Sequence, residues 1–67
     1  MARLRDARDT QNLTQEAVAV QAGISRTYYN HIETGRRVPS LKVALALARI
    51  LGVPVESLFR DSSSATG

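Results

Sequence analysis

The sequence predicts an all-α domain built from five short helices, and three observations point to it. Ala, Leu, Val and Arg dominate the composition, whereas aromatic residues are scarce, a balance that favours helices over sheets. Residues that cap helix N-termini alternate along the chain with glycines that end helices. The 67 residues suffice for one domain. Because the chain has no cysteine, its stability must come from apolar packing without disulfides.

The capping signals set the expected bounds of each helix. The helices should span residues 2–11, 15–22, 26–34, 41–51 and 54–59. Thr14, Ser25 and Ser40 are N-cap residues for the second, third and fourth helices, and a glycine directly follows each of these helices. The domain should therefore occupy residues 1–60, with residues 61–67 forming a polar, flexible tail.

Residues 14–35 form a pattern of helix, tight turn and second helix. Gly23 allows the backbone to reverse without a Cβ clash, and Ile24 fills the space between the two helices. Ser25 caps the second of them and directs its N-terminus outward, where free N–H groups and the positive end of the helix dipole suit phosphate. This pattern is the helix-turn-helix.

The helix expected over residues 26–34 has an unusual outer face. On a helical wheel, Tyr29 and Ile32 lie on the inner side. The outer side carries only hydrogen-bonding side chains that are neither apolar nor acidic: Arg26, Thr27, Asn30, His31 and Thr34. Arg can grip guanine, Asn can pair with adenine, and the Thr methyl group can touch thymine. This face is therefore typical of a helix that lies in the major groove of DNA.

The distribution of charge supports a polyanionic partner. Nine Lys and Arg residues against six Asp and Glu residues give a net charge of +3, and the excess is concentrated in residues 25–49. A positive field in one part of a small domain favours nucleic acid. Paired catalytic carboxylates, a nucleophile–base set and a phosphate loop are all missing from the sequence, so we expect no enzyme. His31 is the only histidine, which argues against a metal site.

Other ligands and locations find no sequence support. No cofactor or small-molecule effector is indicated, and the apolar run of residues 43–48 is too short to span a membrane. The N-terminus shows no apolar signal core. We therefore expect a cytoplasmic protein without membrane contact.

Five different short motifs follow one another across nearly the whole chain. They are Leu13-Thr14-Gln15-Glu16-Ala17-Val18-Ala19, Ala22-Gly23-Ile24-Ser25-Arg26, Ile32-Glu33-Thr34-Gly35, Pro39-Ser40-Leu41 and Ala48-Arg49-Ile50-Leu51-Gly52-Val53. Together they resemble the Cro/repressor helix-turn-helix family (Xre-like, lambda-repressor-like). The resemblance covers Leu4 to Phe59 and implies a five-helix DNA-binding domain that controls transcription, usually as a dimer.

The resemblance also implies roles for individual residues. Base contacts fall to Arg26, Thr27 and His31, with Tyr28 and Asn30 at flanking positions. Phosphate contacts fall to Gln15, at the start of the second helix, and to Thr34, Arg36 and Arg37 after the third. Arg8 and Glu33 match a pair that ties the first helix to the end of the third. For Tyr28, at the edge of the wheel, packing and DNA contact are both open.

The helix expected over residues 41–51 is apolar on two sides. Its core face should hold Leu41, Ala44, Ala48 and Leu51, flanked by Leu45 and Leu47. A small monomer cannot hide a second apolar stripe on the same helix, although scattered surface aliphatics are also normal. We therefore predict a dimer interface made of Val43, Ala46, Ile50, Val55 and Phe59.

These observations lead to one functional prediction and one alternative. The chain should be a sequence-specific regulator of transcription, a repressor or controller that binds double-stranded DNA as a homodimer on an inverted-repeat operator. Phage repressors, restriction-modification controllers and antitoxin-like regulators all include small members of this type. The alternative is a protein-interaction module or antitoxin whose helical surface binds a protein partner.

Overall fold

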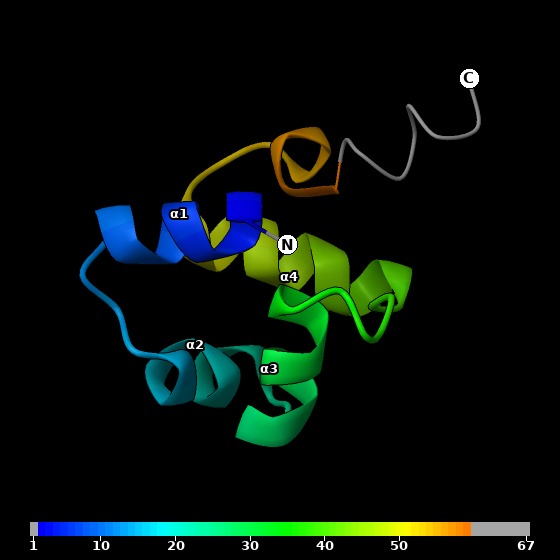
Figure 1. Ribbon diagram of the computed structural model, residues 1–67. Coiled ribbons are helices and arrows are strands. Elements are labelled where there is room, and N and C mark those ends of the chain that lie inside the picture. The colour runs from blue at the N-terminus through cyan, green and yellow to red at the C-terminus, as the bar shows by residue number, and fades with distance from the viewer. Residues whose placement is uncertain (1, 60–67) are drawn as a thin grey trace.

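The computed structural model describes residues 2–59, and in this part of the chain short turns and loops connect helices only (Figure 1). Its helices are α1 (Ala2–Thr10), α2 (Gln15–Ala22), α3 (Arg26–Glu33) and α4 (Leu41–Leu51). A fifth, short helix covers residues 55–59, directly after Pro54. The predicted all-α class and the five helices are therefore confirmed. The predicted tail, residues 61–67, lies outside the described residues.

The predicted N-caps hold the starts of three helices. The hydroxyl oxygens of Thr14 and Ser25 each accept a hydrogen bond of 3.0 Å from the backbone amide three residues later, and Ser40 does so at 3.2 Å. Each bond satisfies one amide that the helix itself leaves without a partner. The short helices therefore begin at the residues that the sequence indicated.

The ends of two helices differ slightly from their predicted bounds. α1 stops at Thr10, one residue early, because Asn12 takes a left-handed backbone conformation with φ 58° and closes the turn. α3 stops at Glu33, and Thr34 is its C-cap. The turn between α2 and α3 is as predicted, since Gly23 has φ 73° and its amide bonds back to α2.

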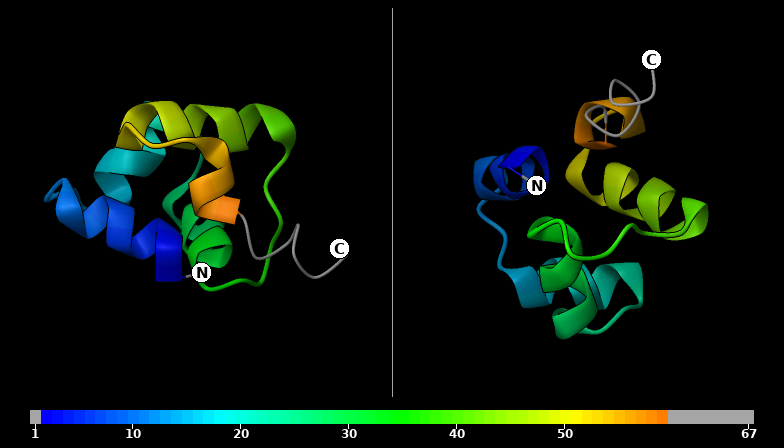
Figure 2. Two further views of the ribbon diagram at one scale, coloured as in Figure 1. Left: turned by 90° about the horizontal axis from the view of Figure 1, so that it is seen from above. Right: turned by 45° about the vertical axis from the view of Figure 1, so that its right-hand side comes forward.

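All the helices contribute to one core. Its buried members are Leu4, Val18, Ala19, Tyr29, Ile32, Leu47, Ala48, Leu51 and Leu58. α2 packs against both α3 and α4, and α1 packs against α3. Figures 1 and 2 show α2 and α3 together at one end of the molecule and the helix of residues 55–59 at the other. The helix-turn-helix therefore projects from a scaffold formed by the remaining helices.

The buried face of α4 differs from the predicted one. Leu47 is fully buried, whereas Leu41 is 74% exposed and Leu45 is 47% exposed. The centre of the buried face thus lies near Leu47 and Leu51, so Leu41, in the first turn, and Leu45 fall at its edge. The prediction that Leu41 and Leu45 belong to the core face was wrong.

Candidate nucleic-acid interface

The outer face of α3 is a polar surface beside the start of α2. Arg26, Thr27 and Asn30 are exposed, and His31 is half-buried. The opposite face carries Tyr29 and Ile32, both fully buried. Burial of those two side chains fixes the rotation of α3, so the hydrogen-bonding side chains must face solvent. The helical wheel predicted this division.

A shallow hollow of about 220 Å³ joins the starts of α2 and α3. Gln15, Arg26, Thr27 and Asn30 line it. Tyr28 lies at the rim of α3, half-buried and packed against the core. The structure thus brings Gln15, which the resemblance assigned to phosphate, together with three of the predicted base-contacting residues, whereas Tyr28 and His31 do not line the hollow.

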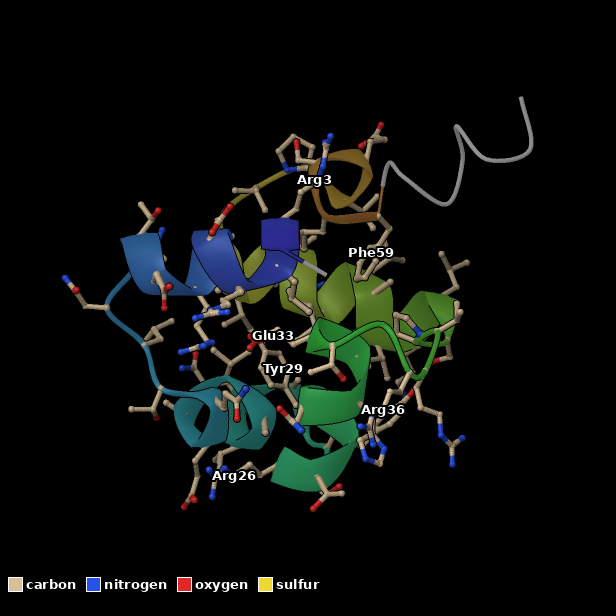
Figure 3. The ribbon with its side chains drawn as sticks, viewed as in Figure 1. Arg3, Arg26, Tyr29, Glu33, Arg36 and Phe59 are labelled. Carbon is tan, nitrogen blue, oxygen red and sulfur yellow. The ribbon has the colours of Figure 1, made fainter. Side chains whose placement is uncertain are left out.

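The segment after α3 folds back onto the end of that helix. The backbone amides of Arg36 and Arg37 both donate to the His31 carbonyl, at 2.8 and 3.1 Å. Both arginines are exposed, and Figure 3 shows Arg36 beside α3. The Thr34 hydroxyl is also exposed, but its hydrogen is donated to the Asn30 carbonyl at 2.9 Å. The exposed side chains of Arg36 and Arg37 therefore flank the outer face of α3 at its C-terminal end.

A buried ion pair anchors α3 to α1. Arg8 Nε donates to Glu33 Oε2 at 2.9 Å, and Arg8 Nη2 donates to Glu33 Oε1 at 3.3 Å. The side chains of Arg8 and Glu33 are only 13% and 5% exposed. The pairing implied by the resemblance is confirmed. Because the pair has little access to solvent, removing one partner would leave the other charge uncompensated and would destabilise the fold more than breaking a surface pair.

The ion pair forms part of a larger polar cluster, visible between α1, α2 and α3 in Figure 3. Burial acts to raise the pKa of Glu33, but hydrogen bonds from Arg8 and Gln15 outweigh it and hold that pKa below its ordinary value. The pKa of Arg8 is raised, chiefly by its hydrogen bond to Glu33. Burial raises the pKa of Tyr29, and the nearby Glu33 carboxylate adds to the effect, although the buried Tyr29 hydroxyl makes no well-formed hydrogen bond.

The predicted dimer residues lie in two different settings. Val43, Ala46 and Ile50 are half-buried, and Val43 and Ile50 pack against the core of their own chain. Val55 and Phe59 line an open groove of about 390 Å³. The other apolar side chains that line the groove are Val38, Pro39, Leu41 and Ala44. Two strongly exposed apolar side chains, Val38 and Leu41, therefore line this groove, whereas exposed Val20 and Leu45 lie elsewhere.

Sequence reasoning gave Val38 no role and placed Leu41 in the core, yet both side chains are strongly exposed. Val38 lies between Arg37 and Pro39 in a loop, and an apolar residue in such a loop has no helix face through which to reach the core. The loop position of Val38 could therefore have predicted its exposure. No sequence feature predicted the exposure of Leu41, because Leu41 continues the apolar pattern of α4.

Comparisons with known proteins agree with this geometry. A family model for the helix-turn-helix matches residues 4–58. A transcriptional regulator of this type from Methanocaldococcus jannaschii is 42% identical over 57 residues, which cover 85% of this chain and 86% of that protein. The control protein C.MunI of a Mycoplasma species is 40% identical over 50 residues, covering 75% of this chain and 68% of that protein.

A phage repressor and a solved structure give the same result. The transcriptional repressor RstR of a cryptic phage of Vibrio cholerae is 36% identical over 62 residues, covering 92% of this chain and 56% of the repressor. The crystal structure of the restriction-modification controller protein C.AhdI from Aeromonas hydrophila superposes with a TM-score of 0.79 at 38% identity. That match covers 85% of this chain and 86% of the controller.

None of the helices in the described part of the chain is long and apolar enough to cross a membrane. The family model covers α1 from Leu4 onward and all of α2, α3 and α4, including the α2–turn–α3 unit that carries the exposed polar face. Two of these relatives are named as a transcriptional regulator and a transcriptional repressor. The chain therefore belongs to the Xre/lambda-repressor-like helix-turn-helix family of DNA-binding transcriptional regulators.

Proposed function

We propose that this protein binds a specific sequence of double-stranded DNA, in the cytoplasm, as a homodimer on an inverted-repeat operator. The observation that carries the proposal is the outer face of α3, which offers side-chain donors and is flanked by the exposed guanidinium groups of Arg36 and Arg37. Arg26 and Thr27 would contact base edges, together with Asn30 and the half-buried His31. Tyr28 would contact DNA only through its exposed edge.

Phosphate contacts would hold α3 in register on the duplex. Arg36 and Arg37 would supply charge at one end of the helix. At the other end, the Thr14 hydroxyl caps the amide of Ala17, while the amides of Gln15 and Glu16 open the helix. Helix geometry directs such amides outward, where they suit a phosphate oxygen. The Thr34 hydroxyl already donates its hydrogen to the Asn30 carbonyl. Its oxygen would therefore contact phosphate by accepting a hydrogen bond from a bridging water.

The dimer would form through the groove lined by Val55 and Phe59, extended by Val38 and Leu41. Val43, Ala46 and Ile50 do not line this groove and lie on the other side of α4 from Leu41, so they would stay outside this interface. Figure 3 shows Phe59 at the opposite end of the molecule from Arg26, so association leaves the reading face free. A two-fold dimer places two recognition helices about 34 Å apart, one turn of DNA.

Binding to DNA is tested by salt titration and sequence selection. The affinity for a random-sequence duplex should fall steeply between about 50 and 200 mM salt, because each phosphate contact releases counterions. Selection from a random DNA pool should then yield two inverted half-sites whose centres lie about 10 base pairs apart. Salt-independent binding, or no enrichment of any sequence, would contradict the proposal. That outcome would favour the alternative in which the apolar groove binds another protein.

The homodimer is tested separately with Leu41→Glu and the matched control Val20→Glu. Both side chains are strongly exposed, at 74% and 70%, so both variants should keep the fold. Only Leu41 lines the groove. Sedimentation equilibrium should therefore show a monomer for Leu41→Glu and a dimer for wild type and Val20→Glu. A wild type that stays monomeric at high micromolar concentration would refute the homodimer.

A further inference from the structure

Both hydrogens of the Gln15 side-chain amide are donated to other side chains of the protein. Its Nε2 atom donates to Glu33 Oε1 at 2.9 Å and to Asn30 Oδ1 at 3.1 Å. A primary amide nitrogen carries two hydrogens, so both donors of Gln15 are used. The side chain thus has no hydrogen left for a phosphate oxygen, which accepts hydrogen bonds but cannot donate them.

The direction of these hydrogen bonds is fixed by the carboxylate. Ionised Glu33 can only accept, and Arg8 holds it in place with two bonds of 2.9 and 3.3 Å. Gln15 must therefore turn Nε2, and not Oε1, toward Glu33. The second hydrogen on Nε2 then selects the oxygen of Asn30, which leaves the Nδ2 group of Asn30 as the end of the chain. The hydrogen bonds run from a buried ion pair to an exposed side chain on α3.

We propose that Gln15 and Glu33 are positioning residues that orient Asn30, so that Asn30 reads a base by donating from Nδ2. The inference rests on the proposed DNA binding and names the chemistry that Asn30 recognises. In the major groove the matching acceptors are purine N7, guanine O6 and thymine O4. Cytosine presents only the N4 donor on that edge, so a cytosine facing Asn30 is disfavoured. Phosphate anchoring at the start of α2 then falls to backbone amides.

Three variants test the orienting role of Gln15. Gln15→Met keeps the length of the side chain and removes both hydrogen bonds, Asn30→Ala removes the reader, and the third variant combines the two changes. Discrimination is measured at each base pair of the selected operator, and affinity is also measured for a random duplex. A single hydrogen bond is worth a factor of about two to thirteen, so Gln15→Met should reduce discrimination by that factor at the base pair that Asn30→Ala affects. Its affinity for the random duplex should stay within about twofold of wild type.

The combined variant separates positioning from phosphate contact. If Gln15 acts through Asn30, Gln15→Met causes no further loss of discrimination in the Asn30→Ala background. If Gln15 anchors phosphate, Gln15→Met instead weakens binding to operator and random duplex by the same factor, with or without Asn30, and the inference is overturned. Melting temperatures of all variants, followed by circular dichroism, control for loss of folded protein.

Asn30→Asp tests the polarity of the reader. The aspartate still accepts from Gln15 but replaces the outward Nδ2 donor with an oxygen. Discrimination at the affected base pair should fall as far as in Asn30→Ala, whatever uniform weakening the added charge causes. Retention of that preference by Asn30→Asp would overturn donation by Asn30. A wild type that prefers no DNA sequence would overturn the proposed function as well. Uniform weakening by Gln15→Met, or a preference retained by Asn30→Asp, would overturn only the role of Asn30 and leave the proposed function standing.

Discussion

Replacing Glu33 by Gln removes the charge from the carboxylate that joins three helices while nearly preserving the size of the side chain. Glu33 accepts two hydrogen bonds from Arg8 in α1 and one from Gln15 in α2. In Glu33→Gln, one side-chain oxygen becomes an amide nitrogen that faces donors, and Arg8 loses its charged partner. We expect this variant to fold with a substantial loss of stability.

The size of the loss follows from burial of the pair. Removing one partner of a buried ion pair costs about 3–5 kcal/mol, because the remaining charge is left without compensation. Arg8 keeps a hydrogen bond of 2.8 Å to the Leu13 carbonyl, and its side chain is 13% exposed. These contacts place the cost near the lower limit, about 3 kcal/mol. A domain of this length has a total unfolding free energy on the order of 3–10 kcal/mol, so the variant should be marginally stable.

Thermal and urea unfolding measure this loss. For so small a domain, about 3 kcal/mol should lower the melting temperature by about 12–24 °C. Asp9→Asn is the matched control, because Asp9 lies 3.6 Å from the same Arg8 but its side chain is 59% exposed. Its cost should stay below about 1 kcal/mol. Equal, small losses of stability in the two variants would refute the reasoning that removing the buried partner of Arg8 costs more than removing the exposed one.

The same pair predicts a pH dependence. Because the folded-state pKa of Glu33 is lowered, its ionisation contributes stability that is fully present above the unfolded pKa of about 4.3. That contribution is lost as the pH falls through the lower folded pKa. The stability difference between wild type and Glu33→Gln should therefore be constant near neutral pH and should narrow below about pH 4. A difference that persists unchanged in acid would show that charge is not its cause.

Three further substitutions probe the turn and the reading face. Gly23→Val should destabilise the fold by about 1–3 kcal/mol in urea unfolding, because φ is 73° there although no neighbouring atom would meet the new Cβ; an unchanged midpoint would contradict the strain. Arg26→Ala should cost about 1–3 kcal/mol of binding free energy and relax preference at one base pair in sequence selection, while a preserved preference would make Arg26 a phosphate contact. Arg37→Ala should weaken binding to operator and random duplex alike and reduce the salt slope by about 1, and a change confined to sequence preference would contradict its phosphate role.

Local signals predicted the fold because they act over a few residues. Thr14, Ser25 and Ser40 cap helices through bonds to amides three residues away, so the sequence alone contains both partners. The polar face of α3 was likewise predictable, since Tyr29 and Ile32 leave a single way to bury that helix. The position of Leu41 was not predictable, because α4 is apolar around most of its circumference and its rotation depends on the helices that pack against it.

The site was predicted as a set of residues but not as a set of contacts. Gln15 and Asn30 are 15 residues apart, and their hydrogen bond exists only because the turn at Gly23 places α2 across the start of α3. The resemblance to the family paired Arg8 with Glu33 but did not give the burial of the pair, whose side chains are 13% and 5% exposed. Depth below the surface depends on helices distant in the chain.

The C-terminal end of α3 is where stability, base reading and association meet. Glu33 lies in the last turn of α3 and belongs to the ion pair, while Gly35 and Arg37 line the apolar groove proposed for the dimer. A change at Arg37 can therefore alter both phosphate contact and dimer formation, and binding to a full operator would mix the two effects. A duplex with one half-site removes the contribution of association. The loss that Arg37→Ala shows there is its phosphate contribution, and any additional loss on the full operator reports the dimer.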